Sequence, residues 1–229
     1  MRLRSRVPAA VGWALGVAVA ASTMAAAERA AAARKLTYYD FRRDVFALSK
    51  LKMAPVVMLG DSLTEAAPWT ELTGCLHLVN RGIGGDTSRG VLARLNEVIA
   101  LRPRAVFLMV GVNDISRNIG KAESADNLRA ILDRLDRAGI RSFASYVLPV
   151  AASYPKKQVN RSIGALNEAF AKVFGEHPGI EVIDIRPLLR GSDGYLREDL
   201  SYDGLHLDAK GYALWRDAIA PHVDKYCAP

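Results

Sequence analysis

The sequence has 229 residues, half of them hydrophobic, and its 31 basic and 24 acidic side chains give a formal net charge of +7. This length suits one domain with a sizeable core, or at most two small domains, and the composition is ordinary for a globular protein. The positive charge does not indicate a nucleic-acid partner, because no run of Lys and Arg interleaved with aromatic residues follows the first segment of the chain.

The first 27 residues have the pattern of a secretory signal peptide. The chain begins with a segment that holds three arginines, residues 7–27 carry no charge, and small residues at 25–27 form a cleavage pattern before Glu28. An uncleaved membrane anchor is the alternative, since the uncharged run is just long enough to span a bilayer. We expect cleavage because alanine dominates the run, and loss of the three arginines would lower the net charge from +7 to +4. The expected product is one exported domain over residues 28–229, in the periplasm or outside the cell.

The remaining chain alternates between two kinds of pattern. Residues 28–50 are first rich in alanine and then amphipathic, which predicts a helical lead-in. Short apolar runs bounded by Gly, Pro, Asn and Asp then predict strands at 56–59, 76–80, 105–110, 141–148 and 181–185. Apolar residues at helical spacing predict helices at 63–72, 88–101, 122–138, 158–174 and 209–226. This alternation predicts an α/β fold with three layers, α/β/α, around a flavodoxin-like, mostly parallel five-stranded sheet.

Two cysteines, Cys75 and Cys227, would meet an oxidising environment in an exported protein. They could pair, but a disulfide needs Cα atoms within about 7 Å of each other, and the sequence does not give their separation. The pairing is therefore open at this level. The histidines outside the motifs are scattered, and we expect surface or structural roles for them rather than metal binding: His77, His177 and His222.

Polar clusters follow the predicted strands, where a parallel sheet of this kind collects its active residues. They are Gly60–Ser62, residues 80–87, Gly111–Asp114 and Asp203–His206. Taken singly, each has a plainer explanation as a helix cap, a tight turn or a surface pair. The glycine-rich segment at 80–87 does not match the dinucleotide-binding fingerprint, and Asp86 within it would repel a phosphate group.

Taken together, the clusters resemble the sequence blocks of SGNH (GDSL) hydrolases. The first block corresponds to Gly60–Ser62, the second to Gly85, the third to Gly111–Asp114 and the last to Asp203–His206. The blocks occur in the family's order and span most of the expected domain. Three surrounding segments are most similar to the branch related to platelet-activating-factor acetylhydrolase and microbial carbohydrate O-acetylesterases: Pro68-Trp69, residues 80–86 and Arg94-Leu95.

The resemblance implies a serine esterase with the SGNH hydrolase fold. Ser62 would be the nucleophile, His206 its general base, and Asp203 the carboxylate that orients the imidazole. The backbone N–H groups of Ser62 and Gly85 and the side-chain amide of Asn113 would form the oxyanion hole. This set completes the chemistry of acyl transfer, so neither a metal nor a cofactor is expected.

Other residues near the blocks are harder to assign. We expect Asp61, Asp86 and Asp114 to fix their loops by bonding local backbone rather than to take part in catalysis. Trp69 could line the substrate crevice or pack in the core. Three tyrosines could contact substrate, but nothing in their spacing selects among them: Tyr146, Tyr154 and Tyr202.

The expected activity is therefore an exported esterase that removes short acyl groups, acetyl in particular, from a small-molecule or glycan ester. A lysophospholipase or thioesterase acting on longer acyl chains is the alternative among enzymes. Outside enzymes, the alternative is a non-catalytic module that binds envelope glycans. A flavodoxin-like nucleotide binder is disfavoured because the loop after the first strand lacks phosphate-cradling glycines. We expect no nucleic-acid partner and no stable membrane insertion after cleavage, and the oligomeric state stays open.

Overall fold

The computed structural model describes residues 36–156 and 158–227. The sheet and the helices after residue 60 lie in the unit Arg42–Pro229, whereas α2 (Tyr38–Ala47) crosses the boundary with the unit Met1–Phe41. The signal peptide predicted over residues 1–27 lies outside the described residues, as does the first part of the predicted lead-in helix. Within the described ranges, no helix combines the length and the apolar character needed to cross a membrane.

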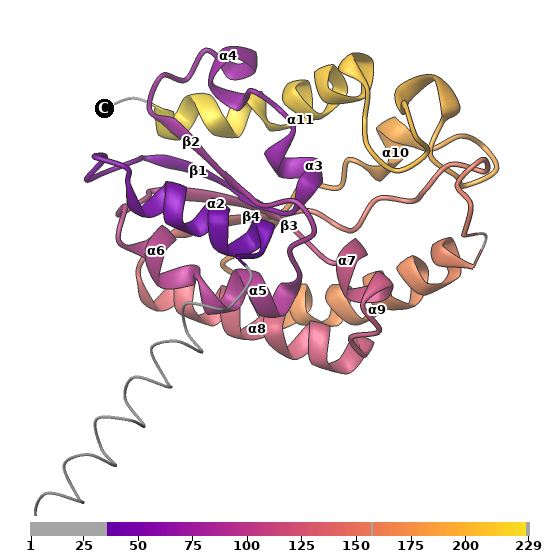
Figure 1. Ribbon diagram of the computed structural model, residues 1–229, viewed down its shortest axis with the longest axis horizontal. Helices are drawn as coiled ribbons and strands as arrows, with labels where there is room; N and C mark the ends of the chain where they lie inside the picture. Colours follow the sequence, from indigo (N-terminus) through magenta and orange to yellow (C-terminus); the bar gives the residue numbers. More distant parts are fainter. Residues whose placement is uncertain (1–35, 157, 228–229) are drawn as a thin grey trace, which may run out of the picture. The chain divides into compact units, whose positions relative to one another are not determined.

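Five parallel strands form the sheet at the centre of the fold (Figure 1). Their order is β2-β1-β3-β4-β5. They are β1 (Val56–Gly60), β2 (Leu78–Gly82), β3 (Ala105–Met109), β4 (Arg141–Ala144) and β5 (Glu181–Val182). Strand β1 is buried along its whole length, because β2 and β3 pair with it on either side and helices cover both faces of the sheet. The predicted α/β fold with a parallel five-stranded sheet is confirmed.

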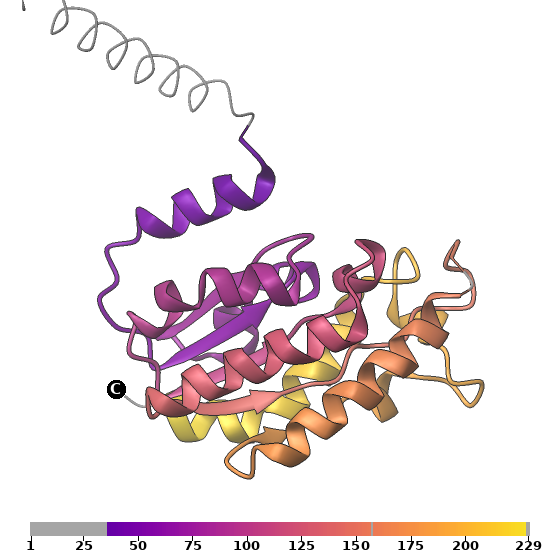
Figure 2. The same ribbon diagram turned by 90° about the horizontal axis from the view of Figure 1, so that it is seen from below.

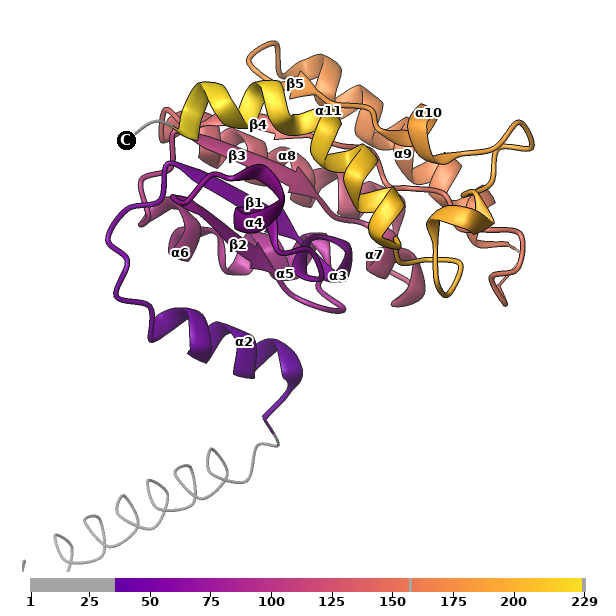
Figure 3. The same ribbon diagram turned by 90° about the horizontal axis from the view of Figure 1, so that it is seen from above.

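Helices cover both faces of the sheet, which gives the three predicted layers. One face carries α5 (Ser88–Ala93), α6 (Leu95–Ile99), α8 (Lys121–Arg137) and α9 (Val159–Glu176) (Figure 2). The other face carries α3 (Ser62–Glu65), α4 (Trp69–Thr73), α10 (Arg186–Leu189) and α11 (Ala209–Cys227) (Figure 3). Alternate side chains of a strand point to opposite faces, so the sheet has two cores. Val57 and Leu59 belong to the first core, and Val56 and Met58 to the second.

Two of the predicted helices are each broken in two. The break between α3 and α4 precedes Pro68, which has no N–H group and disfavours helical backbone at Ala67 before it. The break between α5 and α6 falls at Arg94, whose φ of −101° and ψ of 8° leave the helical region. The sequence patterns do not predict three short elements, because a single turn carries too little periodicity: α7 (Val112–Ser116), α10 and the 3₁₀ helix η1 (Glu198–Leu200).

The boundaries of three strands differ from the predicted ones by two or more residues. Strand β5 ends at Val182, three residues before its predicted end. The strand predicted over 141–148 pairs in the sheet only as far as Ala144. Beyond it, Asn167 of α9 bonds the N–H and carbonyl groups of Val147, each at 2.9 Å, so a side chain replaces a neighbouring strand. Strand β2 begins at Leu78, two residues later than predicted, because a turn from Cys75 leaves Leu76 exposed.

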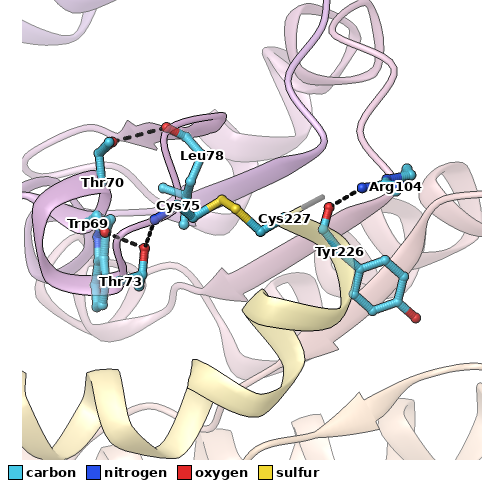
Figure 4. The surroundings of a disulfide bond; sticks show 8 residues. All are labelled: Trp69, Thr70, Thr73, Cys75, Leu78, Arg104, Tyr226 and Cys227. Atoms are coloured by element: carbon cyan, nitrogen blue, oxygen red, sulfur yellow. Dashed lines mark hydrogen bonds between the residues drawn. A yellow bond between two sulfur atoms is a disulfide. The ribbon is translucent and has the colours of Figure 1, made fainter. Parts of the chain in front are cut away.

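The two cysteines form a disulfide bond, which settles the pairing that the sequence left open (Figure 4). Cys75 precedes β2 and Cys227 ends α11, and their Cα atoms lie 5.7 Å apart although 152 residues separate them along the chain. Thr73 accepts the N–H of Cys75 at 3.3 Å and donates to the carbonyl of Trp69 at 2.7 Å. The bond therefore joins the end of the last helix to the segment between α4 and β2.

Candidate active site

The predicted site residues follow adjacent strands at one edge of the sheet. Ser62 begins α3 directly after β1, Gly85 follows β2, and Asn113 lies in α7 after β3. Because β1 lies between β2 and β3, the loops after these strands are neighbours. The N–H of Ile83 donates to the carbonyl of Gly60 at 3.1 Å, which joins the first two loops.

Ser62, His206 and Asp203 form a hydrogen-bonded chain. The hydroxyl Oγ of Ser62 lies 2.9 Å from Nε2 of His206, and Nδ1 of His206 lies 2.6 Å from Oδ2 of Asp203. A carboxylate only accepts hydrogen bonds, so Nδ1 carries the proton and Nε2 is left to accept the Ser62 hydroxyl. The structure thus brings together three of the predicted residues, although Ser62 and His206 are 144 residues apart in the sequence.

The turn around Asp203 orients the imidazole. Asp203 Oδ1 accepts the amide hydrogens of Leu205 at 2.9 Å and of His206 at 2.7 Å. Partial burial works to raise the pKa of Asp203, but the hydrogen bonds from the His206 ring and from these two amides outweigh it. The pKa of Asp203 therefore lies below its ordinary value, and the side chain is a carboxylate at neutral pH. A negative charge beside Nδ1 stabilises an imidazolium, as a general base in this position requires.

The expected oxyanion donors occupy three neighbouring loops. Ser62 is the first residue of α3, where a backbone N–H has no partner within the helix, and Asp61 caps the next amide, that of Leu63, at 3.0 Å. Gly85 has φ +74°, a conformation that suits glycine. Nδ2 of Asn113 donates to the carbonyl of Asp86 at 3.0 Å, so the residue after Gly85 positions this amide and one of its hydrogens remains.

A buried ion pair ties these loops together. Arg94 and Asp86 are joined at 2.8 Å, and their side chains are 1% and 2% exposed. Arg94 also donates to the carbonyl of Arg81 at 2.8 Å and to that of Gly60 at 3.0 Å. Asp86 bonds its neighbouring amide, as predicted, but its ion pair with Arg94 was not anticipated. The signal lies in the sequence, where Arg94 is a charged residue between Val91 and Leu95 on an apolar helix face.

The other two motif carboxylates are also buried. Asp61 caps α3 through local backbone, as predicted, and its burial raises its pKa to about 7. Asp114 does not bond local backbone, so that prediction is wrong. It accepts hydrogen bonds from the N–H and hydroxyl of Ser88 on α5 and from the hydroxyl of Ser124 on α8, the last at 2.8 Å. Asp114 therefore holds the α7 turn against two other helices.

The structure distinguishes among the aromatic candidates. Trp69 is 1% exposed and packs edge-on against Trp215 at 4.9 Å, so it belongs to the core and not to a crevice. Tyr146 packs against Phe174 in the first core. Tyr202 is 70% exposed and lies nearly parallel to the His206 ring, with centroids 5.8 Å apart and planes 13° apart. Tyr202 is thus the tyrosine whose ring contacts a predicted site residue directly.

Two of the scattered histidines contact residues of other segments, whereas His77 is exposed. His177 bonds the carbonyl of Val173 and the carboxylate of Asp133, and His222 lies 3.3 Å from Glu181. Among residues 36–156 and 158–227, no three His, Cys, Asp or Glu side chains gather where they could hold a metal ion.

Known proteins are similar to this chain in the sequence and the fold that carry this site. Residues 58–214 match the model of the GDSL-like Lipase/Acylhydrolase family. The chain is 32% identical over 173 residues to platelet-activating factor acetylhydrolase IB subunit alpha1 of Rattus norvegicus, a match that covers 72% of each chain. It is 29% identical over 173 residues to the alpha2 subunit of the same organism, covering 72% of this chain and 73% of that one. A solved GDSL-like lipase from Bacteroides thetaiotaomicron has the same fold, with a TM-score of 0.69, 24% identity and coverage of 83% of this chain and 99% of that one.

Proposed function

The chain belongs to the GDSL-like lipase/acylhydrolase family, and from this premise we propose that it is an exported serine esterase that removes short acyl groups, acetyl in particular. The observation that carries the proposal is the hydrogen-bonded chain from Ser62 through His206 to Asp203. A serine hydroxyl is a weak nucleophile until a base accepts its proton, and this chain supplies the base and the group that orients it.

In the proposed mechanism, Oγ of Ser62 attacks the ester carbonyl carbon while Nε2 of His206 takes the hydroxyl proton. The carbonyl electron pair becomes an oxyanion, which the amides of Ser62 and Gly85 and the side chain of Asn113 stabilise. The leaving alkoxide departs with the proton from His206, and an acyl group remains on Ser62. Water, activated by the same histidine, then hydrolyses this acyl-enzyme and releases a carboxylic acid.

The acetyl preference is supported by the mammalian relatives, which are acetylhydrolases by name. Tyr202 supports a ring-bearing leaving group such as a sugar. His206 protonates the leaving oxygen, so the leaving group lies beside His206, where the exposed ring of Tyr202 offers a flat apolar surface.

A panel of esters tests the activity. p-Nitrophenyl acetate, butyrate and octanoate, together with acetylated xylan, are compared with Ser62→Ala as the control. We expect acetate to give the highest kcat/KM and Ser62→Ala to be inactive on every ester. A preference for octanoate would replace this proposal with a lysophospholipase or thioesterase activity. A folded wild-type protein that hydrolyses none of the esters would favour a non-catalytic glycan-binding module.

Export is supported by the signal-peptide pattern and by the disulfide, since such bonds persist in oxidising compartments. Fractionation of cells that express the full chain, followed by N-terminal sequencing, tests it. We expect a mature protein that begins at Glu28 outside the cytoplasm. An unprocessed chain in the cytoplasm with reduced cysteines would contradict export without affecting the esterase proposal.

A further inference from the structure

Arg117 places a positive charge beside a proposed oxyanion donor. It follows α7 directly, and a side-chain carbon built on Gly85 would lie 3.1 Å from Nη2 of Arg117. The same turn carries Asn113, since the N–H of Arg117 donates to the carbonyl of Asn113 at 3.0 Å. The backbone that positions Asn113 therefore also fixes where the Arg117 side chain starts.

The guanidinium of Arg117 is exposed and makes no hydrogen bond or ion pair with another residue in the described part of the chain. Other arginines at this end of the sheet are engaged. Arg94 is paired with the buried Asp86, and Arg89 with Glu123. Arg117 thus lies exposed beside Gly85, and no carboxylate of the described chain lies within 4 Å of its guanidinium. The Glu65 carboxylate, which accepts the N–H of Gly84 at 2.7 Å, is engaged with that amide.

A bound ester comes within reach of this guanidinium. Catalysis requires the oxyanion to lie about 3 Å from the Gly85 amide, so the substituents on the reacting carbon lie close to Gly85 as well. Guanidinium groups match carboxylates and phosphates with two parallel hydrogen bonds. We propose that Arg117 binds an anionic substituent, a carboxylate or a phosphate, on the ester substrate. The preferred substrates are then acyl esters of acidic compounds, such as acetylated acidic sugars, and this conclusion rests on the proposed esterase function.

Matched aryl acetates test the proposal. Phenyl acetate is neutral, 3-acetoxybenzoate carries a carboxylate, and 3-acetoxyphenyl phosphate carries a phosphate on the same leaving group. We expect Arg117→Gln to lower kcat/KM by roughly tenfold on the anion that Arg117 recognises and to leave phenyl acetate unchanged. Arg117→Lys should retain part of the preference, and added salt should weaken it.

Arg137→Gln is the matched control. It removes the same charge from an exposed arginine at the end of α8, which precedes β4 and so lies at the opposite edge of the sheet. We expect it to change none of the three rates. If Arg117→Gln lowers kcat/KM equally on all three esters, Arg117 supports the oxyanion or its loop instead. If it lowers kcat/KM on neither anionic ester, Arg117 binds neither anion. Either result overturns the proposal.

A binding measurement separates this proposal from the esterase proposal. Calorimetric titration of Ser62→Ala with 3-acetoxybenzoate, 3-acetoxyphenyl phosphate and phenyl acetate needs no turnover. We expect at least one anionic ester to bind about tenfold more weakly once Arg117→Gln is added to Ser62→Ala. If wild type hydrolyses no ester, the esterase proposal fails, and this titration still shows whether Arg117 binds the anionic group. Equal affinities with and without Arg117→Gln overturn it.

Discussion

Three neighbours contact the imidazole of His206, one at each ring nitrogen and one at a face of the ring. Asp203 fixes Nδ1, Ser62 meets Nε2, and the ring of Tyr202 lies against one face. The first two contacts set the direction in which the proton moves. The third leaves most of the Tyr202 ring open to solvent, beside the imidazole that we propose protonates the leaving group.

Loss of Tyr202 is therefore expected to weaken binding of a sugar leaving group more than it slows the chemical step. Tyr202→Ala should raise KM for acetylated xylan or a sugar acetate several-fold, because the apolar surface is removed, while p-nitrophenyl acetate keeps its kcat to within a few-fold. Steady-state kinetics on both substrates measure the split. Tyr202→Phe, which keeps the ring, is the control and should resemble wild type. An equal fall of kcat on both substrates would assign Tyr202 to holding the imidazole instead.

Asn113 is expected to act on the transition state. Removal of one oxyanion donor costs roughly 2.7–4 kcal/mol, so Asn113→Ala should lower kcat by roughly 100- to 1000-fold while KM stays similar. Circular dichroism and thermal unfolding should show a folded protein, because the Asn113 side chain donates to a single carbonyl, that of Asp86. Turnover close to wild type in a folded variant would remove Asn113 from the mechanism.

The buried carboxyl of Asp61 predicts a pH effect on stability. Its pKa rises from 3.8 to about 7 on folding, chiefly through burial, so the folded state holds a proton that the unfolded state releases. Stability is then lost as pH rises from 3.8 to 7. Asp61→Asn keeps an acceptor for the Leu63 amide and removes this titration. We expect the difference in free energy of unfolding between this variant and wild type to rise with pH in that window, by at most about 1.4 kcal/mol per pH unit in favour of the variant. Urea unfolding at several pH values measures this difference. A difference that does not vary with pH would contradict the assignment.

At the scale of elements, the sequence was informative where patterns are long. The helices at α8, α9 and α11 and the apolar strands β1 and β3 follow their periodicities closely. The four motif blocks predicted which segments come together, because parallel strands bring their carboxyl ends to one edge. The hydrogen bonds that join Ser62, His206 and Asp203 agree with this predicted juxtaposition, and their catalytic roles stay a prediction.

The features that escaped prediction depend on contacts between distant segments. Strand β4 ends early because Asn167, on a later helix, bonds Val147. Asp114 turns away from its own loop because Ser88 and Ser124 are available on α5 and α8. No local pattern states where a side chain finds its partner, so these bonds become visible only in the folded chain.

Arg94 connects the ends of β1 and β2 to the loop that carries Gly85, and its loss should leave Asp86 as a buried charge. We expect Arg94→Met to lower the free energy of unfolding by about 3–5 kcal/mol. The double variant Arg94→Met with Asp86→Asn should be more stable than Arg94→Met alone, because it buries no unpaired charge. Urea unfolding compares the two. A double variant that is no more stable would show that the uncompensated carboxylate is not the cause.

For the whole molecule, the disulfide is the covalent constraint of longest range among the described residues. Cys75 and Cys227 are 152 residues apart in the sequence, and closing a loop of this size restricts the unfolded chain. Replacement of both cysteines by serine should lower the free energy of unfolding by about 2–5 kcal/mol. The kcat on p-nitrophenyl acetate at a temperature below unfolding should not change. Wild type in a reducing buffer should behave like the variant, and equal stability of all three samples would be evidence against the prediction.

The same bond has a consequence for damage to the chain. Ser62 lies before Cys75, whereas Gly85, Asn113, Asp203 and His206 all lie between the two cysteines. A single proteolytic cut in an exposed loop such as residues 191–194 would therefore not release the fragment that bears His206 from the fragment that bears Ser62. The nicked protein would migrate intact without reductant and as two pieces with it. A protein built this way can stay assembled after its backbone has been cleaved.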